Sequence, residues 1–223
     1  CGLCEQQYHG VVMCALGWAC WKTYLGRPET NWARLSAMTA LGNGLEQGLR
    51  HEERLGVIGA QISMFKRHGF TNEINTAGTN MANCLQSLGR LDEALELRRE
   101  LYAEKAALPF ADRIFETVNL AGSLNRTNRF AESKNFVLKN LPEALRALGA
   151  DHDMYLGLRQ FYSVALFNTA DSMDDRREAV AIYGDVLRVS IRVLGRSHPR
   201  TVDRQAFFDK ASKALADLEA AAA

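Results

Sequence analysis

The amino-acid sequence predicts an all-α fold, a right-handed α-solenoid of about four helical hairpins with flanking N- and C-terminal helices. A stretch that begins at Ala82, ANCLQSLGRLDEAL, is nearly repeated as AGSLNRTNRFAESK from Ala121 onward. Alanine, leucine, glutamate and arginine dominate the composition, and runs of strand-favouring residues are scarce. A period close to 40 residues is typical of helical repeats, in which each hairpin covers the apolar face that its neighbour leaves open.

Two more copies of the same pattern frame the first two. The upstream copy reads GNGLEQGLRHEERL, and the downstream copy SVALFNTADSMDDRREAV carries extra residues in its turn. Each copy has a small residue and then leucine three positions later, which is the spacing of one helix face. Ala94 and Ser133 are small where the second helix of a hairpin is expected to cross the first closely. The aligned small residues of the first helices are Gly42, Ala82, Ala121 and Ser163.

The boundaries of the helices follow from local signals. Gly89 and Asn128 end first helices, because glycine and asparagine tolerate the left-handed backbone best. Pro28 and Pro199 lie near helix starts, where a missing N–H costs little. The tail DKASKALADLEAAAA favours a closing helix with a polar outer side. In order, the expected helices span 10–24, 30–48, 52–68, 72–88, 91–107, 111–127, 130–147, 152–169, 175–194 and 199–220.

These patterns divide the chain into three parts. Residues 1–28 form an N-terminal cysteine-containing segment with an aromatic helix, residues 29–205 form the repeat array, and residues 206–223 form a C-terminal capping helix. Since the chain begins with cysteine rather than methionine, we expect a fragment or mature piece with a missing upstream part.

The hairpins NMANCLQSLGRLDEALELRRELY and NLAGSLNRTNRFAESKNF, with the linkers LGADHDMY and LGRSHPRT, resemble the tetratricopeptide repeat (TPR) family. The lengthened repeats of kinesin light chains are the most similar form. The resemblance covers about residues 30–205 and is strongest over 80–140; Arg54 departs from it, because the family has alanine there. The N-terminal segment also resembles the lead-in to TPR arrays of algal and protist proteins, in which a cysteine-rich zinc module precedes the repeats.

The resemblance implies a binding scaffold whose first helices line a concave groove that holds a peptide or a partner helix. The polar face formed by Asn83, Gln86 and Ser87 agrees with this, because amides donate and accept hydrogen bonds and can hold an extended backbone. The same face is equally typical of a solvated surface. Arg126 could bind a carboxylate through its guanidinium fork. The groove-facing residues implied are Thr39, Asn43, Glu46, Gln47, Thr79, Asn83, Gln86, Ser87, Asn125, Arg126, Gln160, Phe167 and Asn168.

A second candidate surface is the aromatic stretch GWACWKTYLGRP. It contains Trp18, Trp21 and Tyr24, and aromatic side chains are frequent anchors of interfaces. The stretch either caps the first repeat or docks a missing domain or a partner.

The cysteines at the start of the chain allow three interpretations of metal binding. Cys1 and Cys4 form a C-x2-C pair, which supplies two of the four ligands of tetrahedral zinc, so the pair could close a RING-like module that lies mostly upstream. With His9 and Cys14 the spacing also matches a zinc knuckle. The third reading is that no metal binds, since Cys14 falls on the apolar face of a predicted helix, where a free cysteine acts as a small hydrophobe.

Composition and motifs exclude several function classes. Twenty-seven basic and 26 acidic residues give a net charge of +1, so no general affinity for nucleic acid is expected, and the longest apolar run is too short to span a bilayer. An odd number of cysteines, five, favours a reducing intracellular compartment, either cytoplasm or organelle. GNGLEQG follows no strand and lacks the Gly-Lys-Ser/Thr ending of a phosphate loop, and no nucleophile with a base is visible. We therefore expect no enzyme and no resident cofactor apart from possible zinc.

The predicted function is a non-catalytic scaffold or adaptor that binds a peptide or partner subunit through the groove, the aromatic surface or both. One alternative is the substrate-recognition part of a zinc-containing ubiquitin ligase. Another is a structural subunit of a larger complex, with contacts over its convex face and ends. A third is RNA binding through the knuckle, which would depend on salt.

Overall fold

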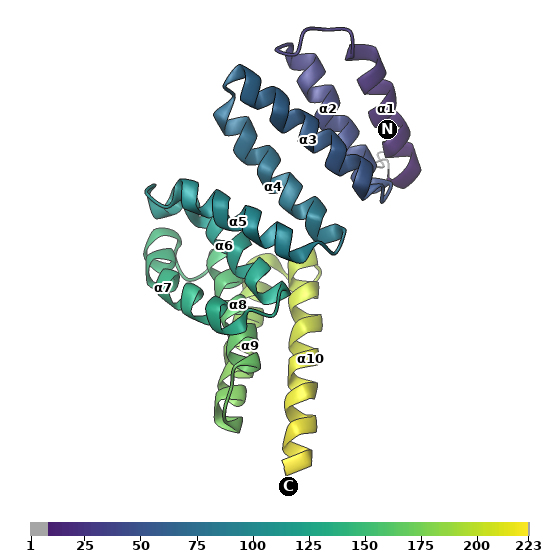
Figure 1. Ribbon diagram of the computed structural model, residues 1–223. Coiled ribbons are helices and arrows are strands. Elements are labelled where there is room, and N and C mark those ends of the chain that lie inside the picture. Colours follow the sequence, from purple (N-terminus) through teal and green to yellow (C-terminus); the bar gives the residue numbers. More distant parts are fainter. Residues whose placement is uncertain (1–8, 223) are drawn as a thin grey trace. The chain divides into compact units, whose positions relative to one another are not determined.

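The computed structural model describes residues 9–222, and in this range it contains ten helices and no strand (Figure 1). The predicted all-α fold is confirmed, and every helix boundary lies within two residues of its expected position. The boundary expected after residue 205 falls inside the last helix. The helices are α1 (Gly10–Tyr24), α2 (Trp32–Gln47), α3 (His51–His68), α4 (Thr71–Ser87), α5 (Leu91–Lys105), α6 (Phe110–Arg126), α7 (Phe130–Leu148), α8 (Asp153–Asn168), α9 (Met173–Leu194) and α10 (Pro199–Ala222).

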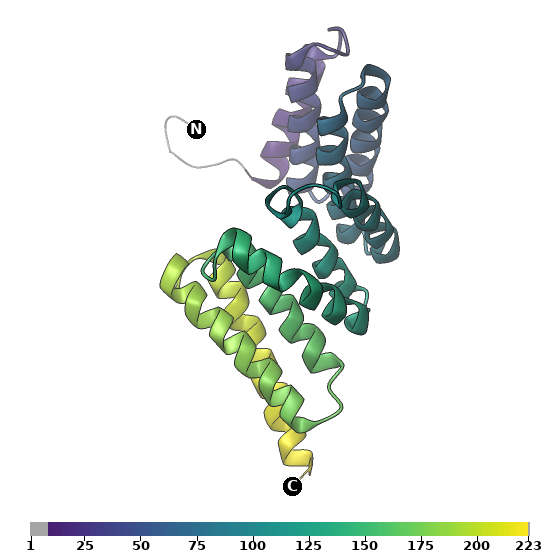
Figure 2. The same ribbon diagram turned by 90° about the vertical axis from the view of Figure 1, so that its left-hand side faces the viewer.

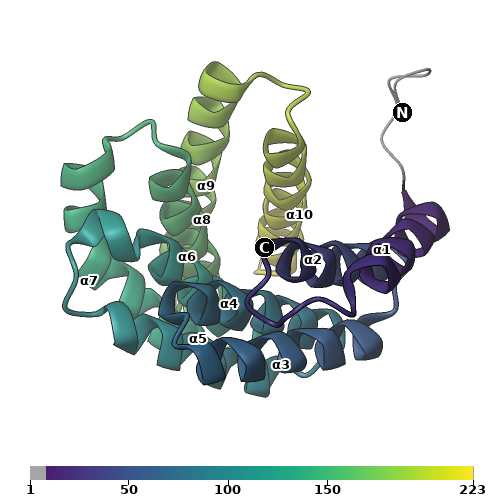
Figure 3. The ribbon, with the colours of Figure 1, turned by 90° about the horizontal axis from the view of Figure 1, so that it is seen from above.

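The chain forms two compact units, Cys1–Leu101 and Tyr102–Ala223, named unit 1 and unit 2 below. In unit 1, α1 packs on α2, α2 on α3 and α3 on α4 (Figure 3). In unit 2, the helices from α6 to α10 also pack each on the next, and α6 contacts α8 (Figure 2). Contact between α6 and α8 places the first helices of successive hairpins side by side.

The hairpins turn at equivalent positions of the repeat. Leu49, Gly89 and Asn128 have φ values of 56°, 75° and 58°, so the left-handed turn predicted at Gly89 and Asn128 is present. In the second copy, Arg90 opens the next helix and donates to both carboxylate oxygens of Glu93 at 2.6 Å. This bidentate pair secures the turn against the first residues of α5.

The aligned small residues of the four copies all lie in the interior of the fold. Gly42, Ala82, Ala121 and Ser163 are all buried. Arg54 is also buried, with its guanidinium 3.0 Å from the carboxylate of Glu46. The arginine that departs from the repeat pattern therefore fits only because its charge is paired.

Each unit has its own apolar core. Met38, Ile58 and Cys84 belong to one cluster of unit 1, and Cys14 with Leu41 belongs to another. The core of unit 2 is built around Phe110, Ile114, Val137 and Leu158. Burial of these side chains supplies most of the driving force for stacking the hairpins.

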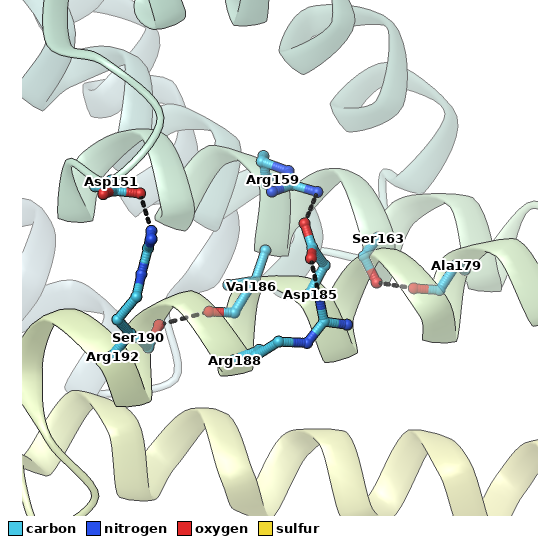
Figure 4. A network of polar contacts seen from close by, with 9 residues as sticks. All are labelled: Asp151, Arg159, Ser163, Ala179, Asp185, Val186, Arg188, Ser190 and Arg192. Atoms are coloured by element: carbon cyan, nitrogen blue, oxygen red, sulfur yellow. Dashed lines mark hydrogen bonds and ion pairs between the residues drawn. The ribbon is translucent and has the colours of Figure 1, made fainter.

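Ion pairs join α8 and α9 at the surface of unit 2 (Figure 4). Asp185 accepts from Arg159 at 2.9 Å and from Arg188 at 2.8 Å, and Arg192 pairs with Asp151 in the linker before α8. Because these groups are half-buried or exposed, they orient the helices more than they stabilise them.

Candidate functional site

A pocket of about 430 Å³ lies in unit 1, where α2, α3 and α4 meet. Since consecutive helices of an array run in opposite directions, α2 and α4 are parallel, and their first halves line the same pocket. Its volume falls in the range of sites that bury a ligand. The lining residues are Trp32, Leu35, Ser36, Thr39, Gln61, Phe65, Asn72, Glu73, Thr76, Ala77 and Asn80.

Apolar side chains form part of the lining. Phe65 and Ala77 are buried, and Leu35 is half-buried. The ring of Phe65 meets that of Phe70 edge to face, with centroids 6.1 Å apart, which fixes its orientation. A ligand group that enters the pocket therefore meets a preformed apolar surface.

Trp32 is the one large aromatic side chain of this lining that is mostly exposed. It is the first residue of α2, and the helix starts there because the side chain of Asn31 accepts a hydrogen bond from Ala33 N at 3.0 Å. The indole is 77% exposed. Exposed tryptophans are favoured anchors of protein interfaces, because a rigid ring loses little conformational entropy on binding.

Polar groups of the pocket are partly engaged with one another. Gln61 is buried and donates through Nε2 to Thr39 Oγ1 at 3.2 Å, while Thr39 donates to Leu35 O at 3.3 Å. Thr76 donates to Asn72 O at 3.2 Å. Hydroxyl and amide oxygens therefore remain as acceptors toward the pocket. Glu73 is the only ionisable residue of the lining.

In unit 1 the residues expected to face a groove have different environments. Thr39 lines the pocket, Asn43 and Gln47 are exposed, and Glu46 pairs with Arg54. Of those expected on α4, Thr79 is buried, Gln86 is half-buried, Asn83 accepts from Arg98, and Ser87 donates to Asn83 O at 3.2 Å.

Unit 2 holds the other predicted groove residues. Asn125 Nδ2 donates to Phe161 O at 2.9 Å, so it ties α6 to α8, and Gln160 accepts from Arg204 at 3.2 Å. Arg126 is exposed. Phe167 and Asn168 line a smaller pocket of about 240 Å³ between α8, α9 and α10.

The aromatic side chains of α1 that were predicted as a docking surface pack against neighbouring residues and are not fully open to a partner. Trp18, Trp21 and Tyr24 are half-buried, and the first two line a pocket of about 360 Å³ with residues of α2 and α3. Arg34 lies over Trp21 at 5.7 Å, and Arg27 lies over Tyr24 at 5.4 Å. The exposed large side chains of α1 are aliphatic instead: Val11, Val12 and Leu16.

The metal-ligating residues predicted from the sequence, Cys1 and Cys4, lie outside the described residues. Within residues 9–222 no group of three or more histidine, cysteine, aspartate or glutamate side chains could hold a metal ion. His9 is exposed and Cys14 is buried, as its position on an apolar face predicts. Cys84 donates through Sγ to His51 O at 3.1 Å, and burial raises the pKa of its thiol. Cys84 is therefore poorly suited to nucleophilic chemistry.

No helix in the part of the chain that the structure describes is long and apolar enough to cross a membrane.

Comparisons with known proteins agree with this architecture. Residues 168–200, which comprise α9 and the linker after it, match a family model described as tetratricopeptide repeat. No curated protein matches the sequence. The match to the family model lies on the last copy of the repeat, whereas the sequence resemblance is strongest over 80–140.

Several solved structures share the fold. TPR-like repeats of a kinesin-light-chain-type protein from Podosopora anserina are 15% identical, with a TM-score of 0.63 over 82% of this chain and 86% of that chain. A variant of the same protein is 16% identical, with a TM-score of 0.60 over 84% and 93%. BtubC (BKLC) from P. vanneervenii is 14% identical, with a TM-score of 0.65 over 94% and 85%. The chain thus has the fold of a kinesin-light-chain-like TPR array.

Proposed function

We propose that this TPR-like array is a protein-interaction scaffold that binds a segment of a partner polypeptide in the pocket between α2, α3 and α4. TPR arrays generally mediate protein–protein interaction and are generally not catalytic. The observation that carries the proposal for this chain is a preformed pocket of about 430 Å³ with the exposed indole of Trp32 beside it. The expected residues of α4 further along the helix support it less, because Thr79 is buried and Asn83 already has a partner.

The chemistry of the lining favours a polypeptide ligand. Apolar side chains such as Phe65 and Leu35 accept an apolar group, while Thr39, Asn72 and Asn80 provide hydrogen-bonding groups for a backbone. A peptide segment combines an apolar side chain with backbone donors and acceptors within a few ångströms. The pocket matches that combination better than it matches a purely apolar or a purely charged ligand.

Selection from a random-peptide library displayed on phage tests the proposal with the full chain as bait. Synthetic copies of the enriched peptides are then titrated by calorimetry. We expect Trp32→Ala to weaken binding at least about tenfold, as is typical for loss of an aromatic anchor. Phe207→Ala is the matched control, because Phe207 is also an exposed aromatic residue, at 54%, but belongs to unit 2. Failure to enrich any peptide that depends on Trp32 would contradict the proposal.

A second function, that of a structural subunit, is favoured by the outer face of α1. Val11 is 82% exposed, Val12 51% and Leu16 45%, which is unusual for neighbouring aliphatic side chains of one helix. A fixed partner would cover this face. We expect Leu16→Glu to abolish such an assembly and to leave the peptide affinity of the pocket unchanged, and co-purification measured beside calorimetry separates the two functions.

A further inference from the structure

Resting on the function proposed above, we propose that the pocket between α2, α3 and α4 takes a basic side chain, lysine or arginine, from the bound polypeptide. The pocket lining contains one ionisable residue, Glu73, and no lysine, arginine or histidine. A ligand that brings a positive charge therefore meets a complementary charge without displacing an existing partner.

Glu73 is available to a ligand. It is the third residue of α4, it is exposed, and the structure has no ion pair to it within residues 9–222. A carboxylate in the first turn also suits the helix dipole. The dipole contributes about half a positive charge at a helix N-terminus, which only partly offsets the full charge of the carboxylate. The α4 side of the pocket therefore keeps a net negative charge.

The pocket lining offers hydrogen-bond acceptors to a basic side chain. One N–H of the Gln61 amide is donated to Thr39, and the carbonyl oxygen of Gln61 is an acceptor for a ligand. The hydroxyl proton of Thr76 is likewise committed to Asn72 O. Lysine and arginine carry only donors, so they match these acceptors, whereas a carboxylate or phosphate would bring further acceptors.

The indole of Trp32 provides the remaining part of a cation site. A cation over an aromatic face is attracted most strongly to tryptophan, and the aliphatic stem of lysine or arginine packs on the same ring. Among the described residues, cations already lie over Trp21 and Tyr24, but none lies over Trp32. A basic side chain of a ligand can therefore lie on Trp32 with its charged end toward Glu73.

The experiment uses the full chain and its Glu73→Gln variant in the same phage selection, followed by calorimetry on one enriched synthetic peptide. In that peptide a lysine is replaced by norleucine, which keeps the stem and removes the charge. Glu52→Gln is the matched control, since Glu52 is also an exposed carboxylate in the first turn of a helix, α3, but does not line the pocket.

We expect the parent and Glu52→Gln to enrich lysine and arginine, and the norleucine peptide to bind about tenfold more weakly, the usual value of a hydrogen bond to a charged group. For the Glu73→Gln variant, replacing the peptide lysine with norleucine should change affinity less than about threefold. The reason is that the lysine ammonium loses its partner when the Glu73 carboxylate is removed. Peptides that depend on Trp32 but lack basic residues, or a norleucine effect unchanged by Glu73→Gln, would overturn this inference and leave the proposed function standing. If the selection enriches no peptide whose binding depends on Trp32, both this inference and the proposed function are overturned.

Discussion

The hydroxyl of Ser163 in α8 donates a hydrogen bond of 2.7 Å to the backbone carbonyl of Ala179 in α9 (Figure 4). In the preceding hairpin the roles are exchanged, because Ser133 of α7 donates to the carbonyl of Ala121 in α6 at 3.4 Å. Both serines are buried. One serine and one alanine thus meet at the same crossing in the third and fourth copies, with the serine on either helix. In these two copies the crossing holds two small residues without a fixed order, whereas the first copy has the paired Arg54 on its second helix.

Substitutions at Ser163 test this close crossing. Ser163→Ala removes one buried hydrogen bond and should lower the free energy of unfolding by about 1 kcal/mol. Ser163→Leu must push α8 and α9 apart and should lower it by about 3 kcal/mol or more. Urea denaturation followed by circular dichroism measures both, with Ser197→Leu in the exposed linker as the control. Equal free energies of unfolding for Ser163→Leu and the parent would contradict the close approach of α8 and α9 at this position.

Two glycines of α2 should respond oppositely to alanine. A Cβ at Gly42 would have no heavy atom within 4 Å, so Gly42→Ala should raise the free energy of unfolding by about 0.5–1 kcal/mol through the lower entropy of the unfolded chain. A Cβ at Gly44 would lie 2.6 Å from the carbonyl oxygen of Met13 in α1. Gly44→Ala should therefore destabilise by about 1–3 kcal/mol. Urea denaturation of the two variants checks the difference in sign.

Leu49 occupies a backbone conformation that suits glycine. Its φ of 56° matches that of Gly89 in the next copy, and its side chain is 77% exposed, so little packing is at stake. A left-handed residue with a side chain costs about 1 kcal/mol or more. Leu49→Gly should therefore raise the melting temperature, and Gly89→Ala should lower it. A melting temperature of Leu49→Gly at or below that of the parent would contradict the strain.

Tyr183 gives unit 2 a dependence on alkaline pH. Its ring is buried, its hydroxyl has no hydrogen-bond partner within the described residues, and burial raises its pKa above the ordinary value of about 10. The contribution of Tyr183 to the free energy of unfolding is fully present below pH 10. It is lost as the pH rises above 10, because the tyrosine of the unfolded chain ionises at a lower pH than the buried one.

Tyr183→Phe should therefore raise the free energy of unfolding at pH 7 by about 1 kcal/mol, since an unsatisfied buried hydroxyl disappears. The advantage over the parent should grow between pH 10 and 11. Tyr162→Phe is the comparison variant, because the pKa of Tyr162 is also raised by burial but its side chain is only half-buried. Urea titrations at pH 7, 10 and 11 measure both, and an advantage that shrinks with pH would refute the assignment.

Most features of the fold depend on residues that are close together in the sequence, which is why the sequence predicts the fold well. Helix boundaries depend on residues such as Gly89 and Asn128, whose backbone preference acts within a few residues. The crossing residues are equally local, since a small side chain recurs with the period of the repeat. Leu49 was not predicted to adopt the left-handed turn, because leucine carries no such preference. The N–H groups of Leu49 and Arg50 bond to the carbonyls of Glu46 and Leu45, which closes the end of α2.

The pocket is harder to predict, because it depends on which groups remain free after packing. Asn125 and Gln160 look like surface amides in the sequence, yet both are used to join helices within unit 2. Trp18 and Trp21 stand out as aromatic but pack against the first hairpin. Trp32 was missed, although its place directly after the N-cap Asn31 signals a first-turn residue with an open side chain.

The most direct test follows the three tryptophan indole N–H signals by NMR while an enriched peptide is titrated into the full chain. Single Trp→Phe variants assign the signals of Trp18, Trp21 and Trp32. If the pocket of α2, α3 and α4 binds the peptide, the Trp32 signal shifts in a saturable way and the other two keep their positions. A shift confined to Trp18 or Trp21, with Trp32 unchanged at saturation, would contradict the account.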